Sequence, residues 1–215
     1  MNERKSWMSQ NVATVAEMVS FCPTFWEICG IDPSDPVAAQ EAARLRTRES
    51  NVMYFVGSAD VDDPVLDPKF KLAPRKRRTR DDWINDRPLA TVMHVPDDFE
   101  INAKGTGTFS PTGIISVVVE KNCLDTEGNI LGDGDMPSEE SANDWIDTSS
   151  NLMEELFQIA SQNRSPRTNK PYPPDKYRLS IRAARLAIPP HFSTLEVNHI
   201  YGPHFIVHIH LRYGF

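Results

Sequence analysis

The sequence predicts an α+β domain that has a mainly antiparallel sheet, helices packed on one face and long interaction loops. Three observations predict it: segments that alternate with period two, one long segment with helical periodicity, and polar or proline-rich stretches between them. All 215 residues fit a single domain, because a chain of this length can bury a sizeable core. An extended loop or arm at 57–87 and an insertion at 122–140 interrupt the regular elements.

The first 46 residues predict three short helices. Residues 11–21 have apolar residues at helical spacing, and residues 24–30 predict one more turn, which ends at a glycine. Asp35 is a predicted N-cap that precedes Pro36, and an alanine-rich helix continues from there over 37–46.

The clearest predicted helix covers residues 143–162. Its apolar residues form one stripe, and Ser141 and Asp144 have the spacing of a capping box. The stripe consists of Trp145, Ile146, Leu152, Met153, Leu156, Phe157 and Ala160.

Five segments predict strands: 51–56, 89–95, 109–119, 177–188 and the closing stretch 204–215. The closing strand has two distinct faces, because successive residues of a strand point to opposite sides. Phe205, Val207, Ile209 and Leu211 form the apolar face, and His204, Ile206, His208 and His210 form the other. We expect the second face to meet solvent or a partner.

The alternative reading of this face is a metal-dependent enzyme. His208 and His210 are spaced to place two imidazoles on one side of a strand, and Asp133 or Asp135 could add a ligand. No metal-binding or nucleophile motif accompanies them, and the three cysteines include no CxxC pair. The sequence therefore predicts no enzyme, no metal and no cofactor.

The distribution of charged residues along the chain suggests a second alternative function. The net charge of −7 excludes a chain that coats nucleic acid with its whole surface. One local run of cations could still contact DNA or an acidic partner, as in a nucleic-acid-binding accessory protein. It consists of Arg75, Lys76, Arg77, Arg78 and Arg80. No apolar run has the length of a membrane span, and the first ten residues lack a signal core.

Several segments, taken in order, resemble one family. Ser20–Phe25 ends a short helix, Arg87–Ala90 enters a strand, and the long helix at 143–162 precedes two strands that end near Tyr213 and Gly214. In this order and length the chain resembles the tail terminator (tail completion) proteins of tailed bacteriophages.

The resemblance implies a structural virion protein without catalysis or cofactor. Such subunits form a hexameric ring that caps the finished tail tube and joins it to the neck or connector. The resemblance places the protein at the tail–neck junction of the virion after synthesis in the host cytoplasm, with neighbouring subunits, tube and connector as partners. It also allows contact with DNA that passes through the lumen. The segments 57–87 and 122–140 are longer than the minimal fold needs, which leaves another neck or head-completion layer as an alternative.

Overall fold

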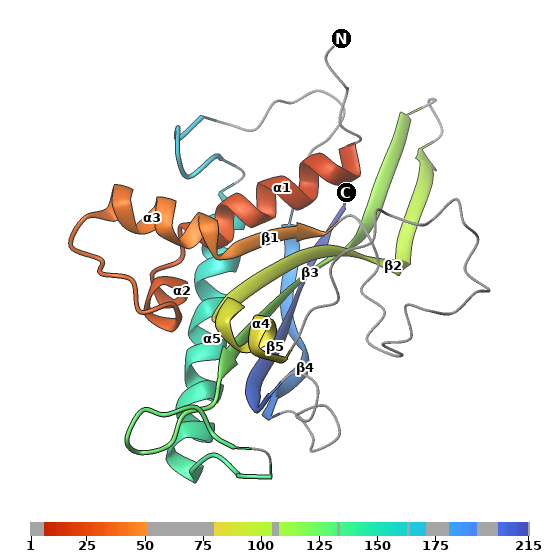
Figure 1. Cartoon of the computed structure of the whole chain (residues 1–215). Coiled ribbons are helices and arrows are strands. Elements are labelled where there is room, and N and C mark those ends of the chain that lie inside the picture. The colour runs from red at the N-terminus through yellow and green to blue at the C-terminus, as the bar shows by residue number, and fades with distance from the viewer. Residues whose placement is uncertain are drawn as a thin grey trace, which may run out of the picture.

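A five-stranded mixed sheet forms the centre of the protein (Figure 1). The computed structural model describes residues 7–50, 80–104, 108–132, 134–162, 164–170, 181–192 and 202–214. The strands are β1 (Thr47–Ser50), β2 (Leu89–Lys104), β3 (Thr108–Asn122), β4 (Ile181–Phe192) and β5 (His204–Tyr213). Their order in the sheet is β1-β2-β3-β5-β4, and only the β1–β2 pair is parallel. The predicted α+β class with a mostly antiparallel sheet is therefore confirmed.

The helices of the described chain are α1 (Trp7–Ser20), α2 (Pro23–Ile28), α3 (Pro36–Leu45), α4 (Arg80–Asp86) and α5 (Glu139–Ser161). The three predicted N-terminal helices are confirmed. Asp35 caps α3 as expected, because its Oδ1 accepts hydrogen bonds from the amides of Val37 and Ala38. Gly30 ends the α2 region at φ +64°, a left-handed conformation that glycine adopts without strain. None of these helices is long and apolar enough to cross a membrane.

The long helix begins earlier than predicted. Ser138 is the N-cap of α5, and its Oγ accepts a hydrogen bond of 3.1 Å from the amide of Ser141. The predicted capping box at Ser141 and Asp144 is wrong, since both residues lie inside the helix. Glu139 and Glu140 occupy the first turn, where carboxylates interact favourably with the helix dipole.

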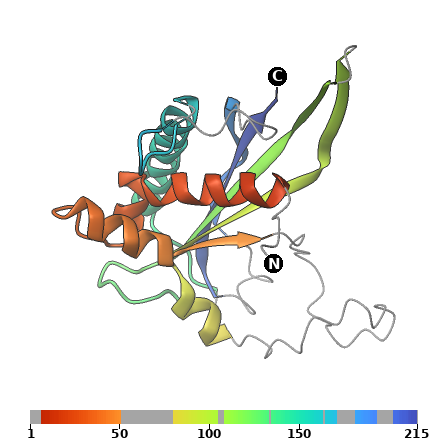
Figure 2. The same ribbon diagram turned by 90° about the horizontal axis from the view of Figure 1, so that it is seen from above.

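The hydrophobic core combines buried residues of helices α1, α2, α3 and α5 with buried residues of strands β2, β3, β4 and β5, whose arrangement Figure 2 shows. Alternate residues of the central strands supply the sheet side of this core, as a period of two requires. They are Ile115, Val117 and Val119 of β3 and Val207, Ile209 and Leu211 of β5, all fully buried. Trp145 of α5 stacks on Phe205 with ring centroids 5.7 Å apart, which joins the long helix to the closing strand.

The remaining strand predictions have mixed outcomes. β2 and β3 contain the predicted strands 89–95 and 109–119 and extend beyond them. β4 contains residues 181–188 of the predicted strand 177–188 and continues to Phe192, while residues 177–180 lie outside the described residues. The predicted strand 51–56 lies outside the described residues. Most of the expected loop or arm 57–87 also lies outside them, and its last described part forms α4.

Candidate functional site

The cationic run predicted as a contact for DNA or a partner lies almost entirely outside the described residues. This applies to Arg75, Lys76, Arg77 and Arg78, whereas Arg80 is the first residue of α4. Two contacts fix α4 to the sheet: Asn122 Nδ2 donates to the carbonyl of Ile84 at 2.8 Å, and Arg48 pairs with Asp86 at 2.8 Å. The run therefore leads into an element that is anchored at the end of β3.

The two histidines of the metal hypothesis lie in the middle of the sheet. On their face of the sheet, His210 pairs with Ser116 of β3 and Arg185 of β4, and His208 pairs with Val118 of β3. None of these neighbours is a carboxylate. No group of three or more potential metal ligands occurs among the residues that the structure describes, where Asp133 is not included. The described residues thus give no support to a metal centre.

His204 corrects the expectation that the whole histidine face meets solvent or a partner. Its ring is buried, with Nδ1 2.8 Å from the carbonyl oxygen of Gly202 and Nε2 3.5 Å from Oε1 of Glu120. His208 and His210 are half-buried rather than exposed. The alternation in the sequence correctly predicted which residues share this face of β5. The solvent exposure of each residue on it depends on the neighbouring elements.

A buried ionic cluster surrounds Glu120. The side chain of Arg87 has no exposed surface, and its Nη2 lies 3.8 Å from Glu120 Oε1, the same oxygen that lies near His204. Arg87 Nη1 also donates to Asn122 Oδ1 at 3.3 Å. Burial lowers the pKa of Arg87, while the Glu120 carboxylate acts in the opposite direction. The cluster joins the residues that begin β2, end β3 and begin β5.

Cys123 lies next to this cluster, so a cysteine–histidine site has to be considered. Burial raises the pKa of the Cys123 thiol to about 12, with Arg87 and Lys121 lowering it by less. A thiol with that pKa remains protonated at neutral pH and is a poor nucleophile. The arrangement is that of a structural ionic cluster rather than a catalytic site.

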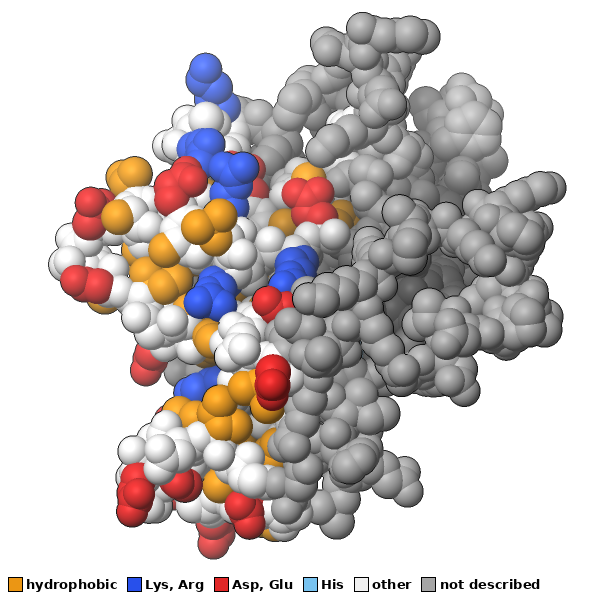
Figure 3. All heavy atoms as spheres, viewed as in Figure 1, with side chains coloured by type: hydrophobic (Ala, Val, Ile, Leu, Met, Phe, Trp, Pro, Cys, Tyr) orange, Lys and Arg blue, Asp and Glu red, His pale blue; other side chains and the backbone are white. Residues whose placement is uncertain are grey.

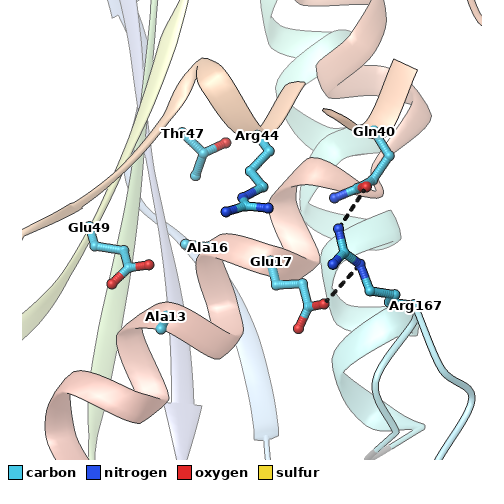
Figure 4. Close-up of a pocket in the computed structure, with 8 residues that line it drawn as sticks. All are labelled: Ala13, Ala16, Glu17, Gln40, Arg44, Thr47, Glu49 and Arg167. Carbon is cyan, nitrogen blue, oxygen red and sulfur yellow. Dashed lines mark hydrogen bonds and ion pairs between the residues drawn. The ribbon is translucent and has the colours of Figure 1, made fainter. Parts of the chain in front are cut away.

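A pocket of about 340 Å³ opens between α1, α3, β1 and the segment that follows α5 (Figure 4). Its lining carries charges of both signs, from Glu17, Arg44, Glu49 and Arg167, over a floor that includes Ala13 and Ala16. Gln40 and Thr47 complete the lining.

Arg167 lies in this pocket and contacts residues of both α1 and α3. Its Nη2 lies 2.7 Å from Glu41 Oε1 and 3.4 Å from Gln40 Oε1, and its Nε lies 3.9 Å from Glu17. Gln40, which is only 4 % exposed, donates in turn to Ser20 Oγ. The contacts of Arg167 with Glu17, Gln40 and Glu41 form a clamp that holds residues 164–170 against α1 and α3. No local pattern in the sequence predicts this clamp, because its members are far apart in the chain.

The β2–β3 hairpin extends beyond the rest of the sheet. β5 pairs with β3 only from Gly113 onward, and β1 pairs with β2 only at Ala90–Met93. Residues 100–104 and 108–112 pair with each other and with no third strand in the part of the chain that the structure describes. Both ribbon views show this hairpin projecting from the body of the molecule (Figures 1 and 2).

The pairing of the projecting hairpin is regular from Glu100–Thr112 to Lys104–Thr108. Each residue of this stretch has its partner on the other strand of the hairpin, and neither strand has a further neighbour there in the described part of the chain. The hairpin is therefore an arm that the sheet does not extend to cover.

The insertion 122–140 has a fixed conformation at its first turn. Leu124 and Ile130 form an antiparallel bridge, and Asp125 Oδ1 accepts hydrogen bonds of 2.8 Å from the amides of Glu127 and Asn129. These hydrogen bonds lower the pKa of Asp125. The turn presents Leu124 and Ile130 to solvent at 41 % and 43 % exposure, and Met136 follows at 70 %.

The insertion and α5 together form a strongly acidic part of the molecule. Residues 122–163 contain ten Asp and Glu residues and no Lys or Arg. Figure 3 shows acidic side chains gathered at the lower end of the view, where Figure 1 places the insertion and the start of α5. Exposed Ile146 and Phe157 add apolar surface on α5. This surface and the hairpin are the two features best suited to contact other proteins.

Comparison with known proteins adds no assignment, since no protein family model matches the chain and no curated protein is significantly similar to it.

Proposed function

We propose that this protein is a structural virion component, a ring-forming tail terminator subunit of a tailed bacteriophage. The ring caps the tail tube and joins it to the neck or connector, and the subunit performs no catalysis. In this proposal all helices occupy one face of the sheet, and the long loops contact neighbouring subunits, tube and connector. The order of the sequence segments and the surfaces described above support it.

The observation that carries the proposal is the projecting β2–β3 hairpin. A two-stranded hairpin is marginally stable on its own in water, and one that extends past its sheet gains stability from packing against another surface. Residues 100–104 and 108–112 form such an arm at one end of the molecule. An arm of this kind suits a subunit that reaches over its neighbour in an assembly.

A subunit of a ring also needs a second contact surface that differs from the β2–β3 hairpin. Subunits joined head to tail use two different patches, and such contacts close into a ring when the rotation between subunits allows it. The exposed apolar side chains of Leu124, Ile130 and Met136 provide a separate patch on the insertion. One molecule therefore offers two distinct candidates for the two sides of a subunit interface.

The test is the mass of the full chain in solution, measured by light scattering after size exclusion. We expect one discrete oligomer, with a hexamer at six times the subunit mass of 24.3 kDa. Replacing residues 100–112 by a two-residue turn should convert it to monomers whose circular dichroism still indicates a folded sheet. A wild-type protein that stays monomeric at all concentrations, and that does not bind purified tail tubes, would disprove the proposal.

A further inference from the structure

We infer that the outer face of α5 receives the basic segment 69–80 of a second copy of this chain. This inference rests on the proposed function, because it identifies one contact of the proposed ring. The outer face is defined here by Ile146, Met153 and Phe157 together with Asp147 and Glu154.

Helix geometry separates this face from the core. The core residues Trp145, Leu152 and Leu156 are each followed by one of Ile146, Met153 and Phe157, and one residue corresponds to about 100° of rotation around a helix. The second set therefore forms its own apolar strip beside the core stripe. Ile146 is 45 % exposed and Phe157 is 37 % exposed, whereas Met153 between them is half-buried and also packs against the core.

Acidic side chains border the strip. Asp147 and Glu154 are exposed, lie about 200° from the core stripe, and form no ion pair with any residue in the described ranges. The surrounding residues 122–163 supply no cation of their own. A partner with both apolar and basic residues would therefore match this face in both respects.

The chain itself contains a segment with that chemistry. Residues 69–80 read Lys-Phe-Lys-Leu-Ala-Pro-Arg-Lys-Arg-Arg-Thr-Arg, with seven cations, no carboxylate, and Phe70 and Leu72 among them. Fully extended, twelve residues span about 40 Å, and the 23 residues of α5 are about 35 Å long. The segment is long enough to follow the whole helix.

Because every copy of the chain carries both the acidic face of α5 and the basic segment 69–80, the two can meet between copies. Each subunit offers one acidic face and one basic segment, so a head-to-tail arrangement pairs every face with the segment of its neighbour. Such charge pairing would also fix which surfaces meet, since two acidic faces or two basic segments repel each other.

Charge reversal tests this pairing. The acidic-face variant carries Asp147→Arg and Glu154→Arg, and the basic-segment variant carries Arg77→Glu and Arg78→Glu. We expect each to raise the subunit concentration at half-assembly by at least about tenfold, and the combined variant to recover most of that loss. A control variant, Glu27→Arg with Glu49→Arg, makes the same change of charge on exposed residues elsewhere and should assemble like wild type.

The outcomes separate this inference from the proposed function. A wild-type oligomer that none of the reversals weakens overturns the inference and leaves the ring proposal standing. Reversals that change only the unfolding of a single subunit, or only its affinity for DNA, also overturn it, because they place the segment on its own chain or on nucleic acid. A wild-type protein that stays monomeric overturns the inference, and one that also fails to bind purified tail tubes overturns the ring proposal as well.

Discussion

Thr24 donates two hydrogen bonds to the carboxylate of Glu155, which lies 131 residues away in the sequence. The amide of Thr24 is 3.0 Å from Oε2, and its hydroxyl is 2.8 Å from Oε1. Thr24 is in the first turn of α2, where backbone amides have no partner within the helix. Since the N-cap Cys22 makes no side-chain hydrogen bond, α5 supplies the cap that the local sequence lacks.

Glu155→Ala should therefore lower the free energy of unfolding by about 1–3 kcal/mol, because the amide and hydroxyl of buried Thr24 lose their acceptor. Urea unfolding followed by tryptophan fluorescence measures the change. Gln158→Ala, at an exposed position of the same helix, is the matched control and should change the value by less than about 0.5 kcal/mol. Equal effects of the two substitutions would show that the cap contributes little.

Arg87 should be among the least replaceable residues of the sheet. Removing its buried guanidinium leaves the Glu120 carboxylate with less compensation, and breaking a buried ion pair typically costs about 3–5 kcal/mol. We expect Arg87→Ala to lower the denaturation midpoint strongly, whereas Arg185→Ala, at an exposed position of β4, should have little effect. Similar midpoints for the two variants would contradict a structural role for the cluster.

Gly113 and Tyr213 are paired across β3 and β5, and their contact leaves no room for a side chain at residue 113. A Cβ on Gly113 would lie 2.7 Å from the hydroxyl oxygen of Tyr213. Gly113→Ala should destabilise the protein by about 1–3 kcal/mol through overpacking.

The same substitution should cost less in a Tyr213→Phe background, because the closest atom is then absent. The two single variants and the double variant form a thermodynamic cycle, with the free energy of unfolding as the readout. An additive double variant would mean that the glycine is required for another reason.

Stability should fall above about pH 9 because of the cysteines. Burial raises the pKa of Cys29 and of Cys123 from 9.0 to about 12, and raises that of Cys22 as well. In the unfolded chain the thiols ionise near pH 9, so deprotonation favours unfolding as the pH rises from 9 toward 12. Below pH 9 this contribution to stability is fully present.

The loss amounts to at most about 1.4 kcal/mol for each thiol and pH unit. Urea unfolding under reducing conditions at pH 8, 9 and 10 measures the slope, and Cys123→Ala should make it shallower than that of wild type. An unchanged slope would mean that the thiol also ionises in the folded protein.

The sequence predicted those parts of the fold whose cause is local. Asp35 and Pro36 predict the start of α3 because a cap needs only the next few amides, and the alternation over 204–213 predicts β5 and its core face. The prediction for the start of α5 was wrong by four residues. Two serines three residues apart could both serve as caps, and only the folded chain shows that Ser138 does.

The features of the candidate sites were harder to predict from the sequence than the helices and strands. The insertion 122–140 was predicted from its composition, yet the clamp around Arg167 joins residues more than 120 positions apart, for which no local pattern exists. The burial of His204 was missed for the same reason, since Glu120 reaches it only after β3 and β5 have paired.

By itself the sequence determined which residues alternate, which segments are helical and where charge of one sign accumulates, because these properties depend on neighbours in the chain. Only the tertiary structure decided that α5 caps α2, that Arg87 and Glu120 share a buried site, and that the β2–β3 hairpin extends past its sheet. Each of these depends on register and packing between distant segments, whose free energy is set by burial and pairing rather than by local preference.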